Sequence, residues 1–183
     1  MVRETQRRLA LLAVVAIVAG AWATAFKGTG VTPVASAAAA TPKQQPVARV
    51  VARCPFPKEL RPAFEAAAAD AGIPPAMLWA VAKVESNLHT DAESAAGARG
   101  LLQVMPATAT ALDLNADEPS SNVLAGARYL RQMLDRFHSS DLALAAYNAG
   151  PTAVQVAGGA PSIEVQRYIS NVNQLWHSVA GCR

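Results

Sequence analysis

Prolines and glycines divide residues 57–178 into short stretches, and this division limits the fold more than any other feature of the sequence. Within most stretches the apolar residues, many of them alanine, recur every three or four positions, as on one face of an α-helix. Alanine favours helices, whereas the β-branched runs typical of strands are scarce. Because proline suits the first turn of a helix and glycine its end, the sequence predicts a compact, mainly helical domain of about seven short helices.

The expected helices cover residues 57–71, 75–87, 106–112, 120–137, 141–149, 151–156 and 162–178. Residues 92–105 contain two glycines among mixed small residues and are expected to form a loop or a short irregular strand. The residues 120–122 and Asp141 are the expected N-caps of the fourth and fifth helices. No internal repeat is present, so we expect one folded domain over residues 54–183.

Residues 1–26 have the pattern of an export segment. Arg3, Arg7 and Arg8 precede an uncharged apolar run over residues 9–26, which is typical of a secretory signal. The run also just reaches the length of a membrane span, so an uncleaved membrane anchor is the alternative to a cleaved signal. Small-residue cleavage sites occur at 23–25 and at 35–37. Residues 27–53, rich in Ala, Thr, Pro, Val and Gln, are expected to form a flexible tether.

The charge is distributed unevenly along the chain. Seven of the 16 Lys and Arg residues but only one of the 13 Asp and Glu residues lie in residues 1–53. The expected domain is therefore mildly acidic, which argues against a nucleic-acid partner. The three histidines, His89, His138 and His177, lack the spacing of metal ligands, and no cofactor-binding motif occurs.

Cys54 and Cys182, the only cysteines, lie at the two ends of the expected domain. An even number of cysteines in an exported protein indicates a disulfide. The termini of a domain often lie close together, so a bond between these two is geometrically reasonable. Two free buried thiols are the alternative.

Glu85 stands on the apolar face of the expected helix 75–87. The apolar stripe of that helix consists of Leu78, Val81, Ala82 and Leu88. Burial raises the pKa of a carboxyl group, and a carboxyl that stays protonated near neutral pH is what a glycoside-cleaving general acid requires. The alternative is an ordinary ion pair with His89, four residues further along the helix.

Four sequence blocks and a late tyrosine occur in an order that points to one family. They are Glu85-Ser86, the segment from Ser94 to Ala109 with its Gly-Ala-Arg-Gly-Leu-Leu-Gln and Met-Pro-Ala-Thr-Ala runs, Gly126-Ala127-Arg128-Tyr129-Leu130, Ala146-Tyr147-Asn148-Ala149-Gly150-Pro151, and Tyr168. Over about residues 70–177 the chain resembles the soluble lytic transglycosylase domain. Leu88 and Leu102 depart from that pattern, which usually has an aromatic residue and often a methionine there.

The resemblance implies a lysozyme-like fold and an enzyme that binds peptidoglycan glycan strands. Members of this family cleave the bond between N-acetylmuramic acid and N-acetylglucosamine and leave a 1,6-anhydromuramic end. By position, Glu85 is the expected catalytic acid and base. The residues expected to line or support the glycan groove are Ser94, Gln103, Met105, Tyr129, Ala146, Tyr147, Asn148 and Tyr168. We expect a monomer that needs no cofactor.

Three other interpretations remain open on the sequence alone. A goose-type-like muramidase would use water and, if inverting, a second carboxylate about 6.5–9.5 Å away, for which Asp91, Glu93 and Asp113 are candidates. A peptidoglycan-binding module without catalytic activity, or a purely structural helical bundle, would need no such acid.

Overall fold

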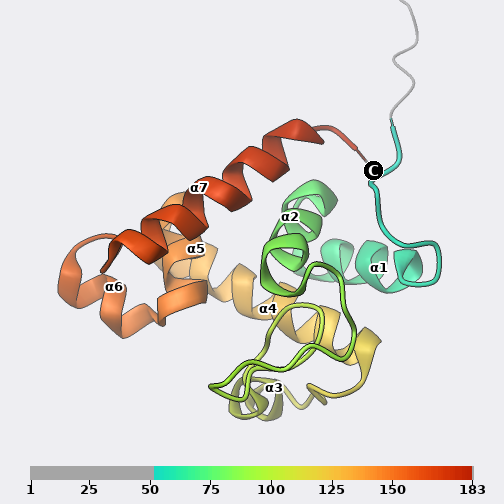
Figure 1. Cartoon of the computed structure of the whole chain (residues 1–183), viewed down its shortest axis with the longest axis horizontal. Helices are drawn as coiled ribbons and strands as arrows, with labels where there is room; N and C mark the ends of the chain where they lie inside the picture. Colours follow the sequence, from blue (N-terminus) through green and yellow to red (C-terminus); the bar gives the residue numbers. More distant parts are fainter. Residues whose placement is uncertain (1–51, 183) are drawn as a thin grey trace, which may run out of the picture. The chain divides into compact units, whose positions relative to one another are not determined.

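The computed structural model describes residues 52–182, which contain seven helices and no strand (Figure 1). The helices are α1 (Arg61–Ala71), α2 (Pro75–Ser86), α3 (Pro106–Ala111), α4 (Pro119–Phe137), α5 (Ser140–Ala149), α6 (Pro151–Ala157) and α7 (Ile163–Ser178). The mainly helical fold is confirmed for this part of the chain. The expected export segment and nearly all of the expected tether lie outside the described residues.

Prolines and glycines set most helix boundaries, as the sequence predicts. A proline occupies the first or second position of α1, α2, α3, α4 and α6. Gly72 and Gly158 end α1 and α6 with φ angles of 60° and 65°, a left-handed conformation that glycine adopts without steric cost. The chain is therefore cut into short helices by residues that either lack an N–H or lack a Cβ.

The first two helices are shorter than expected. α1 begins at Arg61 instead of residue 57, because Pro62 has no N–H to continue a hydrogen-bond ladder from the turn that precedes it. α2 ends at Ser86, since Asn87 adopts a left-handed φ of 52° and its N–H donates to the Lys83 carbonyl. Leu88, with φ of 66°, therefore lies beyond the helix and does not belong to its apolar stripe.

The N-caps of α4 and α5 also differ from expectation. Pro119 occupies the first turn of α4, so the cap falls on Glu118, whose carboxylate accepts from the backbone N–H groups of Ser120 and Ser121. Ser139, not Asp141, caps α5, with its Oγ accepting from Leu142 N at 3.4 Å. Both helices thus start where the sequence offers an oxygen one residue before the first turn.

The core lies between α2 and α4 and the helices packed on them. α4 packs against α1 and α5, and α2 packs against α7 and α1. Large side chains with no exposed surface fill the space between them, including Phe64, Leu78, Leu130, Leu144 and Val172. Burying such a side chain contributes about 1.5–3 kcal/mol each, so these contacts supply most of the driving force for folding.

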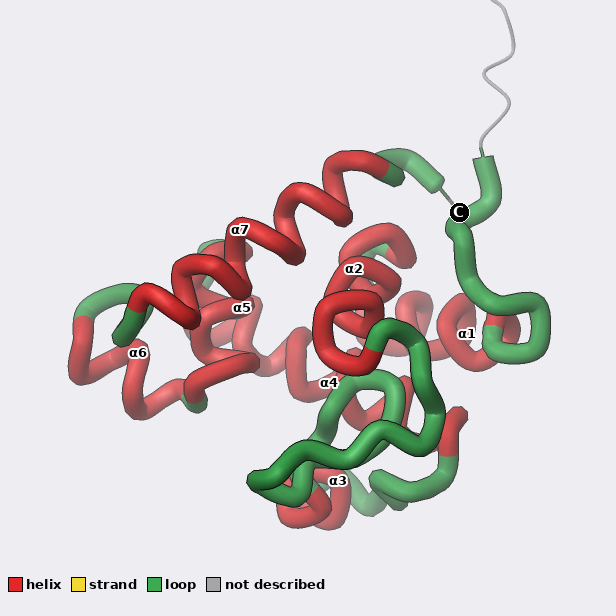
Figure 2. The backbone as a smooth tube through the Cα atoms, viewed as in Figure 1, coloured by secondary structure: helices red, strands yellow, loops and turns green. Residues whose placement is uncertain are grey.

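A long loop joins α2 to α3 and runs over residues 87–105. Figure 2 shows it as a green tube between the ends of these two helices. Two isolated bridges, Glu93 with Arg99 and Arg99 with Val104, are its only ladder-like pairing. The expectation of a loop or irregular strand in this region is confirmed.

A disulfide bond joins Cys54 to Cys182, and both half-cystines are buried. Their Cα atoms are 4.8 Å apart, although 128 positions separate them in the sequence. The predicted disulfide is confirmed and the alternative of two free thiols is wrong. The bond ties the segment before α1 to the segment after α7.

Among residues 52–182, no helix combines the length and apolarity required to cross a membrane. The apolar run over residues 9–26, for which a signal or anchor is expected, lies outside this range.

Candidate active site

Glu85 lies in the last turn of α2 and is half-buried. Loss of hydration raises the pKa of its carboxyl group from the ordinary value of 4.5 to about 7. The hydroxyl of Tyr168 on α7 donates to Glu85 Oε1 at 2.7 Å, which opposes that rise because it stabilises the charged form. The carboxyl group is thus close to half-protonated at neutral pH.

Three buried side chains hold the loop over residues 87–105 at the backbone of Leu101 and Leu102. The Ser86 hydroxyl donates to the Leu101 carbonyl at 2.8 Å. The Tyr147 hydroxyl donates to the Leu102 carbonyl at 2.7 Å, and the Asn122 Oδ1 accepts from Leu102 N at 2.9 Å. We call Ser86, Asn122 and Tyr147 the loop clamp. Ser86 follows Glu85 on α2, Asn122 lies on α4 and Tyr147 lies on α5, so the clamp ties the loop to three helices.

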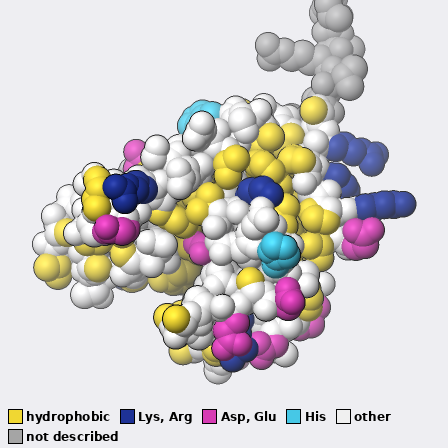
Figure 3. All heavy atoms as spheres, viewed as in Figure 1, with side chains coloured by type: hydrophobic (Ala, Val, Ile, Leu, Met, Phe, Trp, Pro, Cys, Tyr) yellow, Lys and Arg dark blue, Asp and Glu magenta, His cyan; other side chains and the backbone are white. Residues whose placement is uncertain are grey.

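A pocket of about 160 Å³ opens between this loop and the junction of α5 with α6. It is lined by Gln103, Val104, Met105, Thr108, Tyr129, Tyr147, Asn148 and Gly150. Figure 3 shows the molecular surface notched between the part formed by α5 to α7 and the part that contains α3. The lining combines apolar side chains with a few amide and hydroxyl groups and carries no charge, which is the composition of a site for a neutral polar ligand.

Tyr147 connects this pocket to Glu85. Its ring lines the pocket and is 9% exposed, and its pKa is raised well above 10 first by burial and then by the negative charge of Glu85. Its ring centroid lies 5.4 Å from that of Tyr129. Tyr147 therefore links the pocket wall to the acid, while Glu85 itself does not line the pocket.

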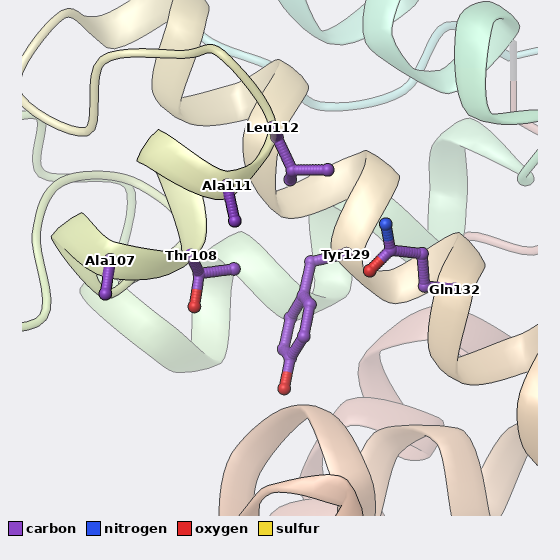
Figure 4. Close-up of a pocket in the computed structure, with 6 residues that line it drawn as sticks. All are labelled: Ala107, Thr108, Ala111, Leu112, Tyr129 and Gln132. Carbon is purple, nitrogen blue, oxygen red and sulfur yellow. The ribbon is translucent and has the colours of Figure 1, made fainter.

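A second hollow of about 320 Å³ lies next to the pocket, between α3 and α4 (Figure 4). Ala107, Thr108, Ala111 and Leu112 line it from α3 and its C-terminal end, and Tyr129 and Gln132 line it from α4. Because Thr108 and Tyr129 line both spaces, the two hollows are adjacent.

Comparison with known proteins places this site in a family. The model of the transglycosylase SLT domain matches residues 62–167, which include the acid, the loop clamp and the pocket. The chain belongs to the transglycosylase SLT family.

Curated relatives and solved structures agree with this SLT assignment. The chain is 41% identical over 86 residues to a transglycosylase of Enterobacteria phage PRD1, covering 46% of this chain and 32% of that protein. It is 38% identical over 96 residues to the membrane-bound lytic murein transglycosylase F of Cellvibrio japonicus, covering 48% of this chain and 19% of the relative. The chain thus spans no more than about a third of these relatives' lengths.

The fold of the SLT domain is that of solved lytic transglycosylases. The 70-kDa soluble lytic transglycosylase of Escherichia coli matches 69% of this chain and 25% of its own, with a TM-score of 0.60 and 26% identity. An inactive Glu-to-Gln variant of the lytic transglycosylase Slt of Pseudomonas aeruginosa matches 70% of this chain and 25% of its own, with a TM-score of 0.59 and 27% identity. The lysozyme-like helical fold is thereby confirmed.

The SLT domain brings seven of the nine predicted site residues together. Gln103, Met105, Tyr129, Tyr147 and Asn148 line the pocket, and Tyr168 contacts Glu85. The negative charge of Glu85 also raises the pKa of Tyr147, whose hydroxyl is bonded to the Leu102 carbonyl. Their roles toward a substrate stay predictions.

Ser94 and Ala146 do not line the pocket. Ser94 closes a turn of the loop, with its Oγ accepting from Ala98 N at 3.0 Å. Ala146 has no exposed surface and packs inside the domain next to Tyr147. Ala146 thus has no surface that a ligand could reach in this structure, whereas Ser94 is partly exposed and its place in the groove stays a prediction.

The predicted alternative of a Glu85–His89 ion pair is wrong. It required both residues on one helix, but α2 ends three residues before His89. His89 is exposed, and its Nδ1 lies 2.9 Å from the Ser86 carbonyl. Within residues 52–182 no group of three His, Cys, Asp or Glu side chains is arranged to hold a metal ion.

Sequence reasoning gave no role in the site to Asn122, Gly126 or Thr108, although Gly126 and Thr108 stand in the motif blocks. Asn122 was expected to cap α4, yet its side chain is fully buried. It lies four residues before Gly126 and eight before Leu130, so its position on the apolar face was the available signal. A Cβ on Gly126 would lie 2.3 Å from the Leu102 Cδ1, so only glycine lets the loop approach α4 this closely.

Proposed function

We propose that this SLT domain is a peptidoglycan lytic transglycosylase that cleaves between N-acetylmuramic acid and N-acetylglucosamine and forms a 1,6-anhydromuramic end. The observation that carries the proposal is the half-buried Glu85 carboxyl, with a pKa of about 7, beside an uncharged pocket. A group with that pKa can both give and accept a proton at neutral pH.

In the first step Glu85 donates its proton to the oxygen of the glycosidic bond as that bond breaks. Oε1 already accepts a hydrogen bond from Tyr168, so the proton of the neutral acid is carried by Oε2 and is directed at the substrate. The acetamido group of the sugar stabilises the developing positive charge at C1. Substrate-assisted glycosidases of this kind need no enzymic nucleophile.

In the second step the ionised Glu85 removes the proton from the C6 hydroxyl of the muramic residue. The C6 oxygen forms a bond to C1, which yields the 1,6-anhydro ring and returns the proton to the enzyme. Because the nucleophile is part of the bound sugar, its attack is intramolecular, and holding it in place supplies much of the rate advantage.

The charges around Glu85 favour this reaction over inverting hydrolysis. Its pKa is set by burial and by Tyr168, with no contribution from another carboxyl group in the described part of the chain. Of the three candidate second acids, Glu93 is bound by the Arg99 guanidinium at 2.9 Å, and Asp91 and Asp113 are exposed. None of them lines the pocket.

The relatives support the same activity. Three of the matched proteins are named as lytic transglycosylases, and the Pseudomonas aeruginosa structure is of an inactive Glu-to-Gln variant. The inactivity of that variant agrees with a mechanism that depends on a glutamate.

The test is the mass of the products that the exported chain releases from purified cell walls. Anhydro ends are lighter than reducing ends by one water, so mass spectrometry separates transglycosylation from hydrolysis. Glu85→Gln should abolish cleavage while leaving glycan binding intact, and Glu59→Gln, at an exposed glutamate, is the matched control. Reducing ends would instead support a muramidase, and binding without cleavage by the wild type would support a non-catalytic module.

We further propose that the enzyme works outside the cytoplasm as a monomer. Residues 1–26 would act as signal or membrane anchor, residues 27–53 as tether and residues 54–183 as catalytic domain. The names of the membrane-bound relatives support a location at the cell envelope. Cell fractionation with N-terminal sequencing of the mature protein decides between signal and anchor, and light scattering measures the oligomeric state.

A further inference from the structure

Asn122 is buried without any exposed surface, yet all the polar atoms of its side chain are paired. Its Nδ2 donates to the Arg99 carbonyl at 2.7 Å and to the Ala116 carbonyl at 2.9 Å. Its Oδ1 accepts from Leu102 N at 2.9 Å. Two of these three backbone groups lie in the loop over residues 87–105, and the third lies just before α4, so the buried amide fixes both segments relative to α4.

The loop is built to accept this amide. Gly100 adopts a φ of 67°, and a Cβ there would lie 2.8 Å from the Asn122 Cγ. Two further hydrogen bonds from the loop clamp hold the carbonyls of Leu101 and Leu102. Hydrogen bonds from α2, α4 and α5 thus hold the two residues just before Gln103, Leu101 and Leu102.

Gln103 adopts a strained backbone conformation, which the hydrogen bonds to Leu101 and Leu102 explain. Its φ is 45°, in the left-handed region that a residue with a long side chain rarely occupies. Backbone strain of this kind costs about 1–3 kcal/mol and persists where the surroundings determine it, commonly at functional sites. The clamp residues therefore offset the strain at Gln103.

The side chain of Gln103 has only one polar atom left for a ligand. Nε2 donates to the Ala92 carbonyl at 3.1 Å and to the Gly100 carbonyl at 3.0 Å, which uses both amide hydrogens. The Ala92 and Gly100 carbonyl oxygens can only accept hydrogen bonds, so the amide atom that faces them must be the nitrogen. Oε1 has no donor among the described residues, and Gln103 lines the pocket.

We propose that Asn122 is a positioning residue that fixes Gln103 as a pure hydrogen-bond acceptor toward the sugar in the pocket. Gln103 then selects an N–H or O–H group of the ligand and rejects a carbonyl or a carboxylate at that point. Asn122 does not line the pocket and makes no hydrogen bond to Glu85; it acts through Leu102 N and the Arg99 carbonyl. This inference rests on the proposed function for its kinetic test, but its structural test needs no substrate.

The kinetic test is a double-mutant cycle on the full chain with soluble glycan strands. Asn122→Ala should lower kcat/KM roughly tenfold to a hundredfold, as expected when a substrate-binding group is misplaced. In the Gln103→Ala background the same change should cost less than about twofold, because the group that it positions is already absent. Equal losses in both backgrounds would overturn the proposal and leave Asn122 a purely structural residue.

The structural test is hydrogen exchange of side-chain amides by NMR. The Gln103 amide protons should exchange more slowly than those of the exposed Gln166, and Asn122→Ala should remove that protection. Fast exchange in the wild type, or protection that survives the substitution, would refute the proposal even if the enzyme had no activity on cell walls.

Two variants separate positioning from loss of stability. Asn122→Ser buries no charge and keeps a small hydroxyl that cannot reach all three backbone groups, so it serves where the alanine variant fails to fold. Phe64→Leu shortens a fully buried side chain on α1 without touching the loop. It should lower the melting temperature while leaving Gln103 protection and kcat/KM per folded molecule unchanged.

Discussion

Glu85→Gln is expected to stabilise the domain at alkaline pH much more than at acidic pH. The folded-state pKa of about 7 lies above the ordinary value of 4.5 that applies to the unfolded chain. Between these two values the folded state retains a proton that the unfolded state has released. The free energy of unfolding of the wild type therefore falls as pH rises through this window, whereas glutamine does not titrate.

The size of the effect follows from the same two pKa values. Each pKa unit corresponds to about 1.4 kcal/mol, so the rise from 4.5 to about 7 corresponds to ~3 kcal/mol above pH 7. For a domain of this size that free energy equals roughly 10 °C in melting temperature. Near pH 4 the carboxyl group is protonated in both states, and the variant and the wild type should unfold at similar temperatures.

The assay is thermal unfolding of the wild type and Glu85→Gln at matched pH values from 4 to 8. Taking the difference between the two proteins cancels the titration of all other groups. Glu59→Gln, at an exposed carboxyl, should give a difference near zero throughout. A difference for Glu85→Gln that does not grow with pH would refute the view that burial keeps this acid protonated.

Three further outcomes are expected. Tyr168→Phe removes the hydrogen bond that stabilises the charged acid, so the alkaline limb of the kcat/KM profile should move up by about one pH unit; a limb that moves down would contradict this. Replacing Cys54 and Cys182 by serine opens a loop of 128 residues and should lower the free energy of unfolding, measured in urea, by about 4–5 kcal/mol. The wild type with its disulfide reduced should show the same loss. Gly126→Ala places a Cβ 2.3 Å from the Leu102 side chain and should destabilise the domain by about 1–3 kcal/mol, whereas Gly159→Ala, with open space at its Cβ, should not.

The sequence predicted the features that depend on local chemistry. Helix starts and ends followed from residues that lack an N–H or a Cβ, and the partial burial of Glu85 followed from its place among Val81 and Ala82. The fold and most pocket residues followed from the resemblance of ordered motifs. The exact caps were harder, because a single proline such as Pro119 moves the first turn by one residue and so changes which side chain can reach it.

The loop clamp could not be predicted from periodicity. Its hydrogen bonds join residues 15 to 45 positions apart, and each runs from a side chain to a backbone atom in an irregular segment. Backbone atoms are the same at every position, so the sequence carries no mark of which one a serine, asparagine or tyrosine will bind. Asn122 on an apolar helix face was the one visible sign, and it also fits a helix cap.

The two influences on Glu85 together explain how one carboxyl group can serve both steps of the reaction. Burial alone would hold the proton too firmly for the acid to release it to the leaving oxygen. The Tyr168 hydrogen bond opposes burial by stabilising the carboxylate that this release creates. Once ionised, the group is again poorly hydrated and readily takes a proton from a sugar hydroxyl. A pKa near neutrality is therefore the balance that a single acid and base requires, since either influence alone would favour one step at the expense of the other.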